Sequence, residues 1–184
     1  ELRHQWIGKT RLLWPVRPEQ MELPLPVLLA CYLSTEQRGD RHVKTVRQLL
    51  DEKGHKVWSL GPEATVFEAI KLMADKGVGA LIVMQGEAPV GLISERDYAR
   101  KVALEGRSSK GTKVSEVMTT RVVCVRPDQS VEESMALMTD KRVRHLPVMV
   151  DGQLLGIISI GDLVKTIIAE QQFIIEQLEH YITG

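Results

Sequence analysis

An internal repeat limits the architecture of this chain before any single motif is considered, because a duplicated segment folds into two copies of one unit. Shifting the 184-residue sequence by 65 positions superimposes residues 62–98 on residues 127–163 without a gap, and 15 of the 37 positions are identical. Chance identity at ordinary composition is about one position in fifteen. The positions kept by the shift include Gly91 and Gly156, Ser94 and Ser159, and Asp97 and Asp162. The chain therefore contains a duplication.

Each copy has the same order of expected elements. A short apolar strand and a proline turn precede a segment with apolar residues at helical spacing, then two β-rich runs flank a turn and a second helix follows. The strands are expected at residues 57–60, 80–85 and 90–94, and at 122–125, 146–150 and 154–159. In the second copy the turn is Asp151-Gly152, a strong hairpin signal. The pattern predicts an α+β fold of two β-α-β-β-α repeats.

One repeat of under about 60 residues makes a marginal core on its own. Packing the two sheets against each other would bury the remaining apolar face, so we predict one body with pseudo-twofold symmetry. The predicted division is an N-terminal extension at residues 1–42, a first repeat with a short lead-in helix (43–50) at 43–110, and a second repeat at 111–184. The internal Met21 makes residues 1–20 look like upstream or added sequence.

The C-terminal segment is expected to form a helix longer than the repeat requires. Its apolar residues recur at positions 164, 167, 168, 174, 175, 178, 181 and 182, which is a helical stripe. A surplus apolar stripe predicts a partner, and a second copy of the chain is the simplest one.

The composition limits the classes of partner. Lys plus Arg and Asp plus Glu both number 24, so the net charge is zero and no general attraction to nucleic acid or to a membrane is expected. The two cysteines, Cys31 and Cys124, form no C-x-x-C motif, which favours reduced thiols and a cytoplasmic location. No pair among the five histidines has metal-ligand spacing, and no apolar run approaches 18 residues. We predict no metal site and no membrane span.

The repeated segments Gly91–Asp97 and Gly156–Asp162 share the motif G-h-h-S-x-x-D, where h is apolar, at a strand-to-helix turn. The Ser-x-x-Asp spacing is first of all that of a helix capping box. The same turn also offers backbone N–H groups, a positive helix end and a carboxylate able to accept two hydrogen bonds from a ribose diol, beside a glycine that permits close approach. The sequence thus leaves two interpretations open, a simple cap and a nucleoside site.

Cations suited to a phosphate occur at this place in only one copy. Arg144 and His145 precede the strand of the second copy, whereas Gly79 and Ala80 hold the equivalent positions in the first. Arginine can bind a phosphate through two parallel hydrogen bonds and histidine can add a donor, although two solvated charges at a strand start are the plain alternative. The small residues leave room for a larger ligand. The two sites are therefore expected to be non-equivalent.

These residues carry a resemblance to a known family. The G-h-h-S-x-x-D turns, the strand Val143–Val148 (VRHLPV) and the connector Val114–Thr119 together resemble a tandem pair of cystathionine-β-synthase (CBS) domains, a Bateman module, over about residues 43–184. The pattern is similar to stand-alone bacterial CBS pairs that bind AMP and NAD. The resemblance implies regulatory binding of adenosine-containing ligands in the cleft between the repeats, and a homodimer.

The resemblance also implies roles for single residues. Asp97 and Asp162 would bind ribose hydroxyls, Arg144 and His145 would lie near phosphate, and adenine would contact the first strand of the opposite copy. The candidate nucleotide-binding residues are Ser94, Arg96, Asp97, Ser159, Asp162, Arg144, His145, Val57, Trp58, Gly79, Ala80, Val122, Val123 and Pro147. AMP and NAD are the expected ligands, ATP and S-adenosylmethionine are alternatives, and no catalytic cofactor is expected.

Three functions are compatible with these patterns. The leading hypothesis is a non-catalytic adenylate sensor that acts on an unidentified protein target. A small nucleotide-processing enzyme is disfavoured because the sequence has no nucleophile–base–orienter set, no P-loop and no G-x-G-x-x-G motif. The third is a structural homodimerisation module with an empty cleft. A nucleic-acid role is weaker still, since the basic charges are sparse and lack interleaved aromatic residues.

Overall fold

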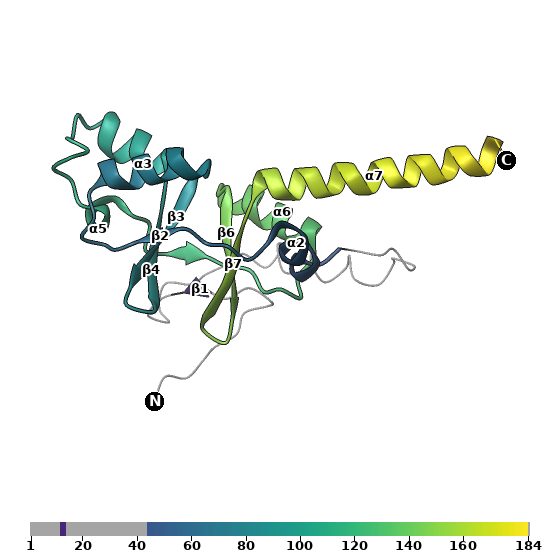
Figure 1. Cartoon of the computed structure of the whole chain (residues 1–184), viewed down its shortest axis with the longest axis horizontal. Helices are drawn as coiled ribbons and strands as arrows, with labels where there is room; N and C mark the ends of the chain where they lie inside the picture. The colour runs from purple at the N-terminus through teal and green to yellow at the C-terminus, as the bar shows by residue number, and fades with distance from the viewer. Residues whose placement is uncertain (1–11, 14–43, 184) are drawn as a thin grey trace.

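Two β-hairpins form the centre of the structure, and each leads into a helix (Figure 1). The computed structural model describes residues 12–13 and 44–183, so the remaining predictions for residues 1–43 lie outside the described residues. The first repeat consists of β2 (Ser59–Leu60), α3 (Val66–Lys76), β3 (Ala80–Gln85), β4 (Ala88–Ser94), α4 (Glu95–Tyr98) and a π-helical turn (Ala99–Ala103). The second consists of β5 (Val122–Val123), α6 (Val131–Lys141), β6 (His145–Val150), β7 (Gln153–Ser159) and α7 (Ile160–Thr183). Helices α2 (Val46–Lys53) and α5 (Val114–Val117) lead into the repeats, and β1 (Leu12–Leu13) pairs antiparallel with β5.

The two hairpins repeat each other in detail. Both are antiparallel, and both have a register shift at the same place, between Val83 and Met84 in the first and between Val148 and Met149 in the second. These positions are equivalent under the shift of 65 residues. The duplication read from the sequence therefore extends to an irregularity of the backbone, and the predicted α+β fold is confirmed.

The turns of the hairpins differ in how well the sequence predicted them. Asp151 and Gly152 have φ values of 48° and 85°, the two positive values that a type I′ turn requires, which confirms the Asp-Gly hairpin. In the first hairpin only Gly86 and Glu87 separate the strands. The prediction of a turn over residues 86–89 is wrong for Ala88 and Pro89, which belong to β4 and pair with β3.

Helices α3 and α6 begin and end at equivalent residues. Thr65 and Ser130 cap their N-termini in complete capping boxes, in which the third helical residue, a glutamate, bonds back to the backbone of the cap. Both helices end in a left-handed residue, Gly77 with φ 63° and Arg142 with φ 53°. Glycine adopts this conformation without a steric penalty and arginine does not.

The two sheets pack against each other through a shared apolar cluster, as the sequence predicted. Its buried members are Ala80, Ile82 and Leu92 from the first hairpin, and Val122, Cys124 and Met149 from the second repeat. Two further clusters lie on the outer faces of the sheets, one under the helices of each repeat. Each sheet is thus buried on both faces, and the two repeats form one body.

The lead-in helices are exchanged between the repeats. In α2, Leu49 and Leu50 lie in the core of the second repeat, whereas Val114 and Val117 of α5 lie in the core of the first. The exchange depends on close contact at a glycine, because a Cβ atom at Gly156 would lie only 2.8 Å from Cδ2 of Leu50. The predicted boundary near residue 110 separates the two repeats along the chain. In the structure, the core of each repeat also contains a helix from the other side of this boundary.

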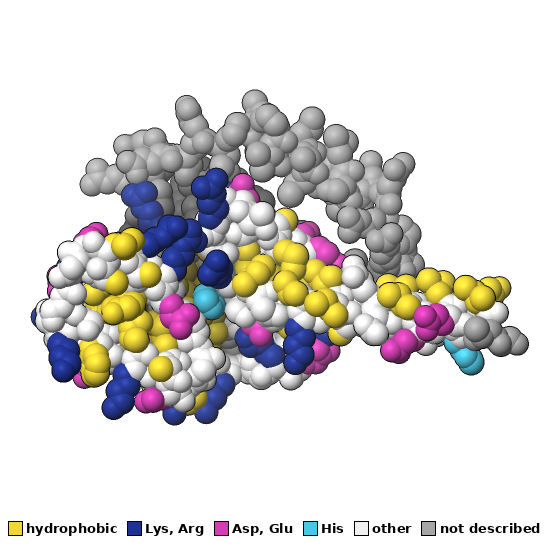
Figure 2. All heavy atoms as spheres, turned by 90° about the horizontal axis from the view of Figure 1, so that it is seen from above, with side chains coloured by type: hydrophobic (Ala, Val, Ile, Leu, Met, Phe, Trp, Pro, Cys, Tyr) yellow, Lys and Arg dark blue, Asp and Glu magenta, His cyan; other side chains and the backbone are white. Residues whose placement is uncertain are grey.

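Helix α7 extends well beyond the body (Figure 1). Its first turns are anchored by Leu163 and Thr166, which are buried, but every residue from Gln171 to Ile182 is exposed. Apolar side chains line one side of this projecting part (Figure 2). They include Phe173, Ile174, Ile175, Leu178, Tyr181 and Ile182. None of the helices in the described residues has the length and apolar character needed to cross a membrane.

Candidate functional site

The two Ser-x-x-Asp turns are capping boxes. In the first, the backbone N–H and the hydroxyl of Ser94 donate to Oδ2 of Asp97 at 3.1 and 2.6 Å. In the second, the same groups of Ser159 donate to Oδ2 of Asp162 at 2.7 and 2.8 Å. The capping interpretation is therefore confirmed for both turns. Each cap occupies only one oxygen of its carboxylate, so a second role for the other oxygen depends on its surroundings.

In the first repeat that other oxygen is also engaged. Oδ1 of Asp97 accepts a hydrogen bond from the Thr119 hydroxyl at 3.2 Å and forms an ion pair with Lys101 at 2.8 Å. The Lys101 ammonium also donates to the Val117 carbonyl at 2.7 Å, which ties the corner to the end of α5. The Asp97 side chain is only 13% exposed. This carboxylate is enclosed by its own chain.

The second repeat has a more open corner. Lys53, the last residue of α2, donates to Oδ2 of Asp162 at 2.5 Å, the same oxygen that the cap uses. Partial burial alone would raise the pKa of Asp162, but the hydrogen bonds from Lys53 and Ser159 outweigh it and lower the pKa. Oδ1 of Asp162 has no hydrogen-bond partner within residues 44–183. The corner therefore has an ionised carboxylate with one acceptor atom to spare.

His145 lies where the two repeats meet. A Cβ atom at Gly79 would lie 3.3 Å from Cε1 of His145 and 3.4 Å from Oε2 of Glu95, so the absence of a side chain at Gly79 admits the imidazole. Burial lowers the pKa of His145, two nearby cations lower it further, and the Asp162 carboxylate opposes them. His145 is accordingly neutral at pH 7 and offers one donor and one acceptor. Ala80, its counterpart in the first repeat, is buried between the sheets.

The strands expected at residues 57–60 and 122–125 are shorter in the structure, β2 at Ser59–Leu60 and β5 at Val122–Val123, so Val57 and Trp58 lie just before β2. The four residues proposed to contact adenine fall into two groups. Val57 packs against the inter-sheet cluster and Val122 belongs to it, so both lie on the side where the repeats meet. Trp58 packs on the core of the first repeat and Val123 on that of the second. One member of each pair therefore packs toward the other repeat and one packs on the core of its own repeat. Pro147 is buried in β6, where its carbonyl accepts a backbone hydrogen bond at 3.0 Å.

Trp58 has a further interaction that the sequence analysis did not foresee. The ammonium groups of Lys56 and Lys76 lie 4.1 and 4.6 Å from the centroid of its ring, within the range of cation–π attraction. The indole is thus engaged by the first repeat itself. Val57, which packs on the side where the two repeats meet, is the better candidate for a wall of the cleft.

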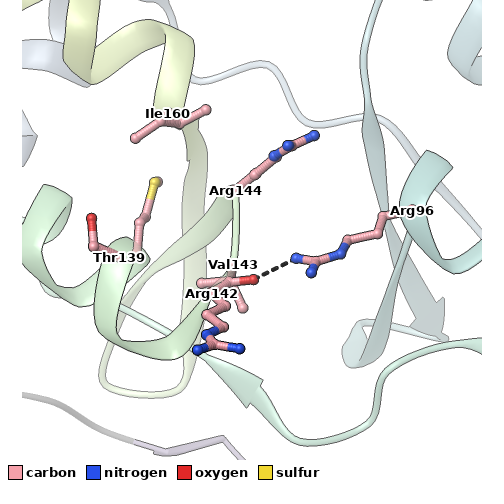
Figure 3. A pocket seen from close by; sticks show the side chains of 7 residues that line it. Arg96, Thr139, Arg142, Val143, Arg144 and Ile160 are labelled. Atoms are coloured by element: carbon pink, nitrogen blue, oxygen red, sulfur yellow. Dashed lines mark hydrogen bonds between the residues drawn. The ribbon is translucent and has the colours of Figure 1, made fainter.

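A pocket of about 300 Å³ opens between the two repeats (Figure 3). Arg96 reaches it from α4 of the first repeat, and its Nη1 donates to the carbonyl of Arg142 at 2.7 Å. Arg144 faces the same gap from the second repeat, as Figure 3 shows. The remaining lining residues are Met138, Thr139, Val143 and Ile160. Ile160 and Asp162 both belong to the first turn of α7, so this turn contributes to the pocket and to the Asp162 corner.

The structure places the predicted residues in several places: Arg96 and Arg144 line the pocket, Ser94 and Asp97 form one corner and Ser159 and Asp162 the other, and Trp58 and Val123 pack on the cores of their own repeats. Four residues that contact these groups were not predicted from the sequence, namely Lys53, Lys101, Thr119 and Arg142. Only Arg142 left a signal in the sequence, because it replaces Gly77 at a helix end under the shift of 65 residues. No cluster of potential metal ligands occurs in the part of the chain that the structure describes.

Comparison with known proteins bears on the family of the chain. The CBS domain model matches residues 46–104 and 114–169. The chain is 43% identical over 125 residues to the mitochondrial CBS domain-containing protein CBSX3 of Arabidopsis thaliana, a match that covers 65% of this chain and only 61% of that protein. A solved protein with CBS domains from Burkholderia ambifaria is 53% identical with a TM-score of 0.67, and the match covers 70% of this chain and 96% of that one.

A more distant structure shares the fold. The CBS domain pair of protein MJ0100, solved in complex with 5′-methylthioadenosine and S-adenosyl-L-methionine, has a TM-score of 0.62 at 19% identity, over 70% of this chain and 98% of that one. Both repeats of the present chain are matched by the CBS model, and both have the predicted turns. The chain belongs to the CBS-domain family as a tandem pair of such domains.

Proposed function

We propose that this chain is a non-catalytic regulatory module that binds an adenosine-containing nucleotide in the cleft between its repeats, with Asp162 holding the ribose. The observation that carries the proposal is that Oδ1 of Asp162 has no hydrogen-bond partner among residues 44–183, in the first turn of α7, which also contributes Ile160 to a pocket lined by arginines. A ribose hydroxyl would donate to this oxygen, while the adjoining arginines would meet the phosphate. AMP, NAD and ATP all contain a ribose and at least one phosphate group. The cytoplasmic location expected from the sequence stays a prediction.

The Asp162 corner is favoured over the Asp97 corner for a physical reason. Both oxygens of Asp97 already accept hydrogen bonds or an ion pair, so a ribose there would have to displace Thr119 or Lys101. At Asp162, the ligand adds a bond without breaking one. The proposed orientation places adenine toward Val57 on the inter-sheet side. The adenosine compounds bound by the MJ0100 pair support the ligand class, although they are known for that protein alone.

Calorimetric titration with AMP, ADP, ATP, NAD and S-adenosylmethionine tests the proposal. We expect Asp162→Asn to weaken the best ligand about ten- to a hundredfold, because a hydrogen bond to a charged group contributes about 1.5–3 kcal/mol. Asp97→Asn is the matched control at the equivalent corner and should change the affinity less than threefold. Failure of all five compounds to bind the wild-type chain, or equal effects of the two variants, would contradict the proposed site.

The non-catalytic part of the proposal rests on the chemistry of the cleft. The Ser159 hydroxyl donates to the Asp162 carboxylate, but this pair caps α7 and the same carboxylate oxygen is also held by Lys53. The Thr139 hydroxyl in the pocket donates to the Met135 carbonyl and not to a base. Incubation with ATP or NAD should therefore leave the nucleotide intact. Turnover that disappears in His145→Gln would overturn this part of the proposal.

A second function, self-association, is favoured by the exposed stripe on α7. We propose that two copies cover each other's projecting apolar residues, because large exposed apolar patches in soluble domains mark contact surfaces. The projecting part, residues 171–182, also contains Glu176 and Glu179 and no lysine or arginine. Equilibrium sedimentation should show a dimer that dissociates when Ile175 and Leu178 are changed to Ser. Lys165→Ser, which changes an exposed residue of α7 outside the projecting part, is the control and should remain a dimer. A monomeric wild-type chain would refute this function.

A further inference from the structure

The two aspartate corners differ in the origin of the lysine that pairs with them. At Asp97, the ammonium of Lys101, four residues later in the chain, lies 2.8 Å from Oδ1. At Asp162, the ammonium of Lys53 from helix α2 lies 2.5 Å from Oδ2. Under the shift of 65 residues, the counterpart of Lys101 is Thr166. Each corner therefore has one lysine, but the two lysines sit on opposite oxygens of the carboxylate.

The choice of oxygen matters because the cap already uses Oδ2 in both corners. A ligand that leaves the cap intact can only bind Oδ1. In the first corner, Oδ1 of Asp97 accepts from Lys101 and from the Thr119 hydroxyl, and a carboxylate oxygen has about two acceptor positions. Oδ1 of Asp162 has no partner within residues 44–183. The lysine position thus separates a used oxygen from an available one.

The Lys101 ammonium is held by more than its ion pair. It donates to the Val117 carbonyl at 2.7 Å and lies 3.5 Å from the Thr119 hydroxyl oxygen. A ribose hydroxyl that displaced Lys101 from Asp97 would replace a bond between two charged groups by a bond with a neutral donor. Bonds between charged groups are the stronger ones, so the exchange would cost hydrogen-bond energy. Lys101 therefore occupies the place that a ribose hydroxyl would need.

The second corner obtains its counter-charge without losing this place. Threonine at position 166 carries no charge, and Lys53 reaches Oδ2 from α2 instead. The counterpart of Lys53 in the first repeat is Met118, an apolar residue that packs on the core of that repeat. The loss of a lysine at one position in the second repeat is thus matched by a lysine at another.

The backbone also differs at the residue that closes the first corner. Lys101 lies in the π-helical turn Ala99–Ala103, whereas the equivalent residues 164–168 belong to the α-helix α7. π-Helical turns are rare and occur frequently at functional sites. The first repeat therefore departs from the regular helix where its lysine meets Asp97.

We infer that the residue at positions 101 and 166 decides whether each corner accepts a ligand, so that the chain binds one nucleotide and not two. Lys101 closes the Asp97 corner, and Thr166 leaves the Asp162 corner open. The inference rests on the proposed function, because it concerns the same contact between a ribose hydroxyl and an aspartate.

The variant Lys101→Thr tests the inference by giving the first corner the residue of the second. Calorimetric titration and native mass spectrometry with the same five adenosine compounds count the molecules bound per chain. We expect one in the wild-type chain and two in Lys101→Thr, with the second lost again in Lys101→Thr/Asp97→Asn. Lys101→Met keeps a long side chain without the charge and should also bind two. Lys101→Arg keeps the cation and should bind one.

The reverse change closes the second corner. Thr166→Lys places a cation four residues after Asp162, as Lys101 follows Asp97, and should weaken binding about ten- to a hundredfold. Thr166 is only 6% exposed, so the melting temperature of this variant is measured as well. If Thr166→Lys does not fold, the Lys101 variants decide the question alone. Lys71→Met, which removes an exposed lysine of α3, is the control for net charge and should bind like the wild-type chain.

The outcomes separate the inference from the proposed function. One ligand in both the wild-type chain and Lys101→Thr, or two in the wild-type chain, would overturn the inference and leave the nucleotide site at Asp162 intact. Binding by Lys101→Thr alone would support closure by Lys101 and contradict the site at Asp162. If neither protein binds any of the five compounds, the proposed function and the inference both fail.

Discussion

The exchange of lead-in helices can be tested by a double-mutant cycle at Leu50 and Gly156, two residues that lie 106 positions apart in the sequence and in contact in the fold. A Cβ atom at residue 156 would lie 2.8 Å from Cδ2 and 3.1 Å from Cδ1 of Leu50, where ordinary contacts are 3.4–4 Å. Leu50 is 1% exposed and has no open space into which to move. Gly156→Ala should therefore destabilise the protein by about 1–3 kcal/mol, the usual effect of overpacking.

The same substitution should behave differently when Leu50 is truncated. Leu50→Ala alone leaves a cavity in the core of the second repeat and should cost about 2–5 kcal/mol. In that background both δ carbons are gone, so the added methyl group at residue 156 meets space and should be neutral or slightly stabilising. The general effect of replacing glycine by alanine on the unfolded chain is present in both backgrounds and cancels in the cycle. The expected coupling energy is about 1–3 kcal/mol, with the double variant more stable than the sum of the single effects.

Urea denaturation of the four proteins measures this coupling, provided that the m-values agree. Gly91→Ala is the matched control, since Gly91 is equivalent to Gly156 but its added Cβ would meet Met118 and Thr119 instead of Leu50. Gly91→Ala and Leu50→Ala should be additive within about 0.5 kcal/mol. Additivity of the Leu50 and Gly156 substitutions within the same limit would refute the contact, and with it the packing of α2 on the second repeat.

Three further predictions concern single residues. Thr65→Ala removes the capping box of α3 and should destabilise the protein by about 1 kcal/mol in urea denaturation, whereas Thr65→Ser should restore most of the loss; equal effects would refute the cap. The pKa of Asp162 is lowered in the folded state, so the Asp162 carboxylate contributes its full stabilisation above the unfolded pKa of about 3.9 and loses it as the pH falls through the folded-state pKa. Asp162→Asn should therefore reduce the acid dependence of the free energy of unfolding, and an unchanged pH profile would contradict this. Burial lowers the pKa of His145, so just below the unfolded pKa of about 6.5 the unfolded state binds more protons than the folded state, and the free energy of unfolding should rise with pH there. The slope of the free energy of unfolding against pH should shrink in His145→Gln, and a slope of opposite sign would exclude a buried neutral imidazole.

Local features of this protein were predictable from its sequence because they depend on neighbouring residues. The Asp151-Gly152 turn requires two positive φ values that these residues adopt readily, and the Ser-x-x-Asp caps close within four residues. The duplication extends this local information, since two similar half-cores must share one interface. Sheet-to-sheet packing follows from the apolar face that each hairpin would otherwise expose.

The candidate site was predictable only in part. Asp162 and Arg144 could be found because they lie in repeated or recognisable segments. Val57 and Trp58 were both candidates for the adenine contact, but which of them faces the other repeat depended on how the second sheet packed. Trp58 accordingly lies on the core of its own repeat, where two lysines contact its ring.

The repeat, the order of its helices and strands, its caps and the two carboxylates at equivalent turns could be read from the sequence. The crossing of α2 to the second repeat, the contact of Lys53 with Asp162 across 109 positions, and the meeting of Arg96 and Arg144 at one pocket became known from the three-dimensional packing. Periodicity and capping motifs describe interactions within one or two turns of chain. The choice of partner between distant segments depends instead on which surfaces fit together, as the space beside Gly156 accommodates Leu50.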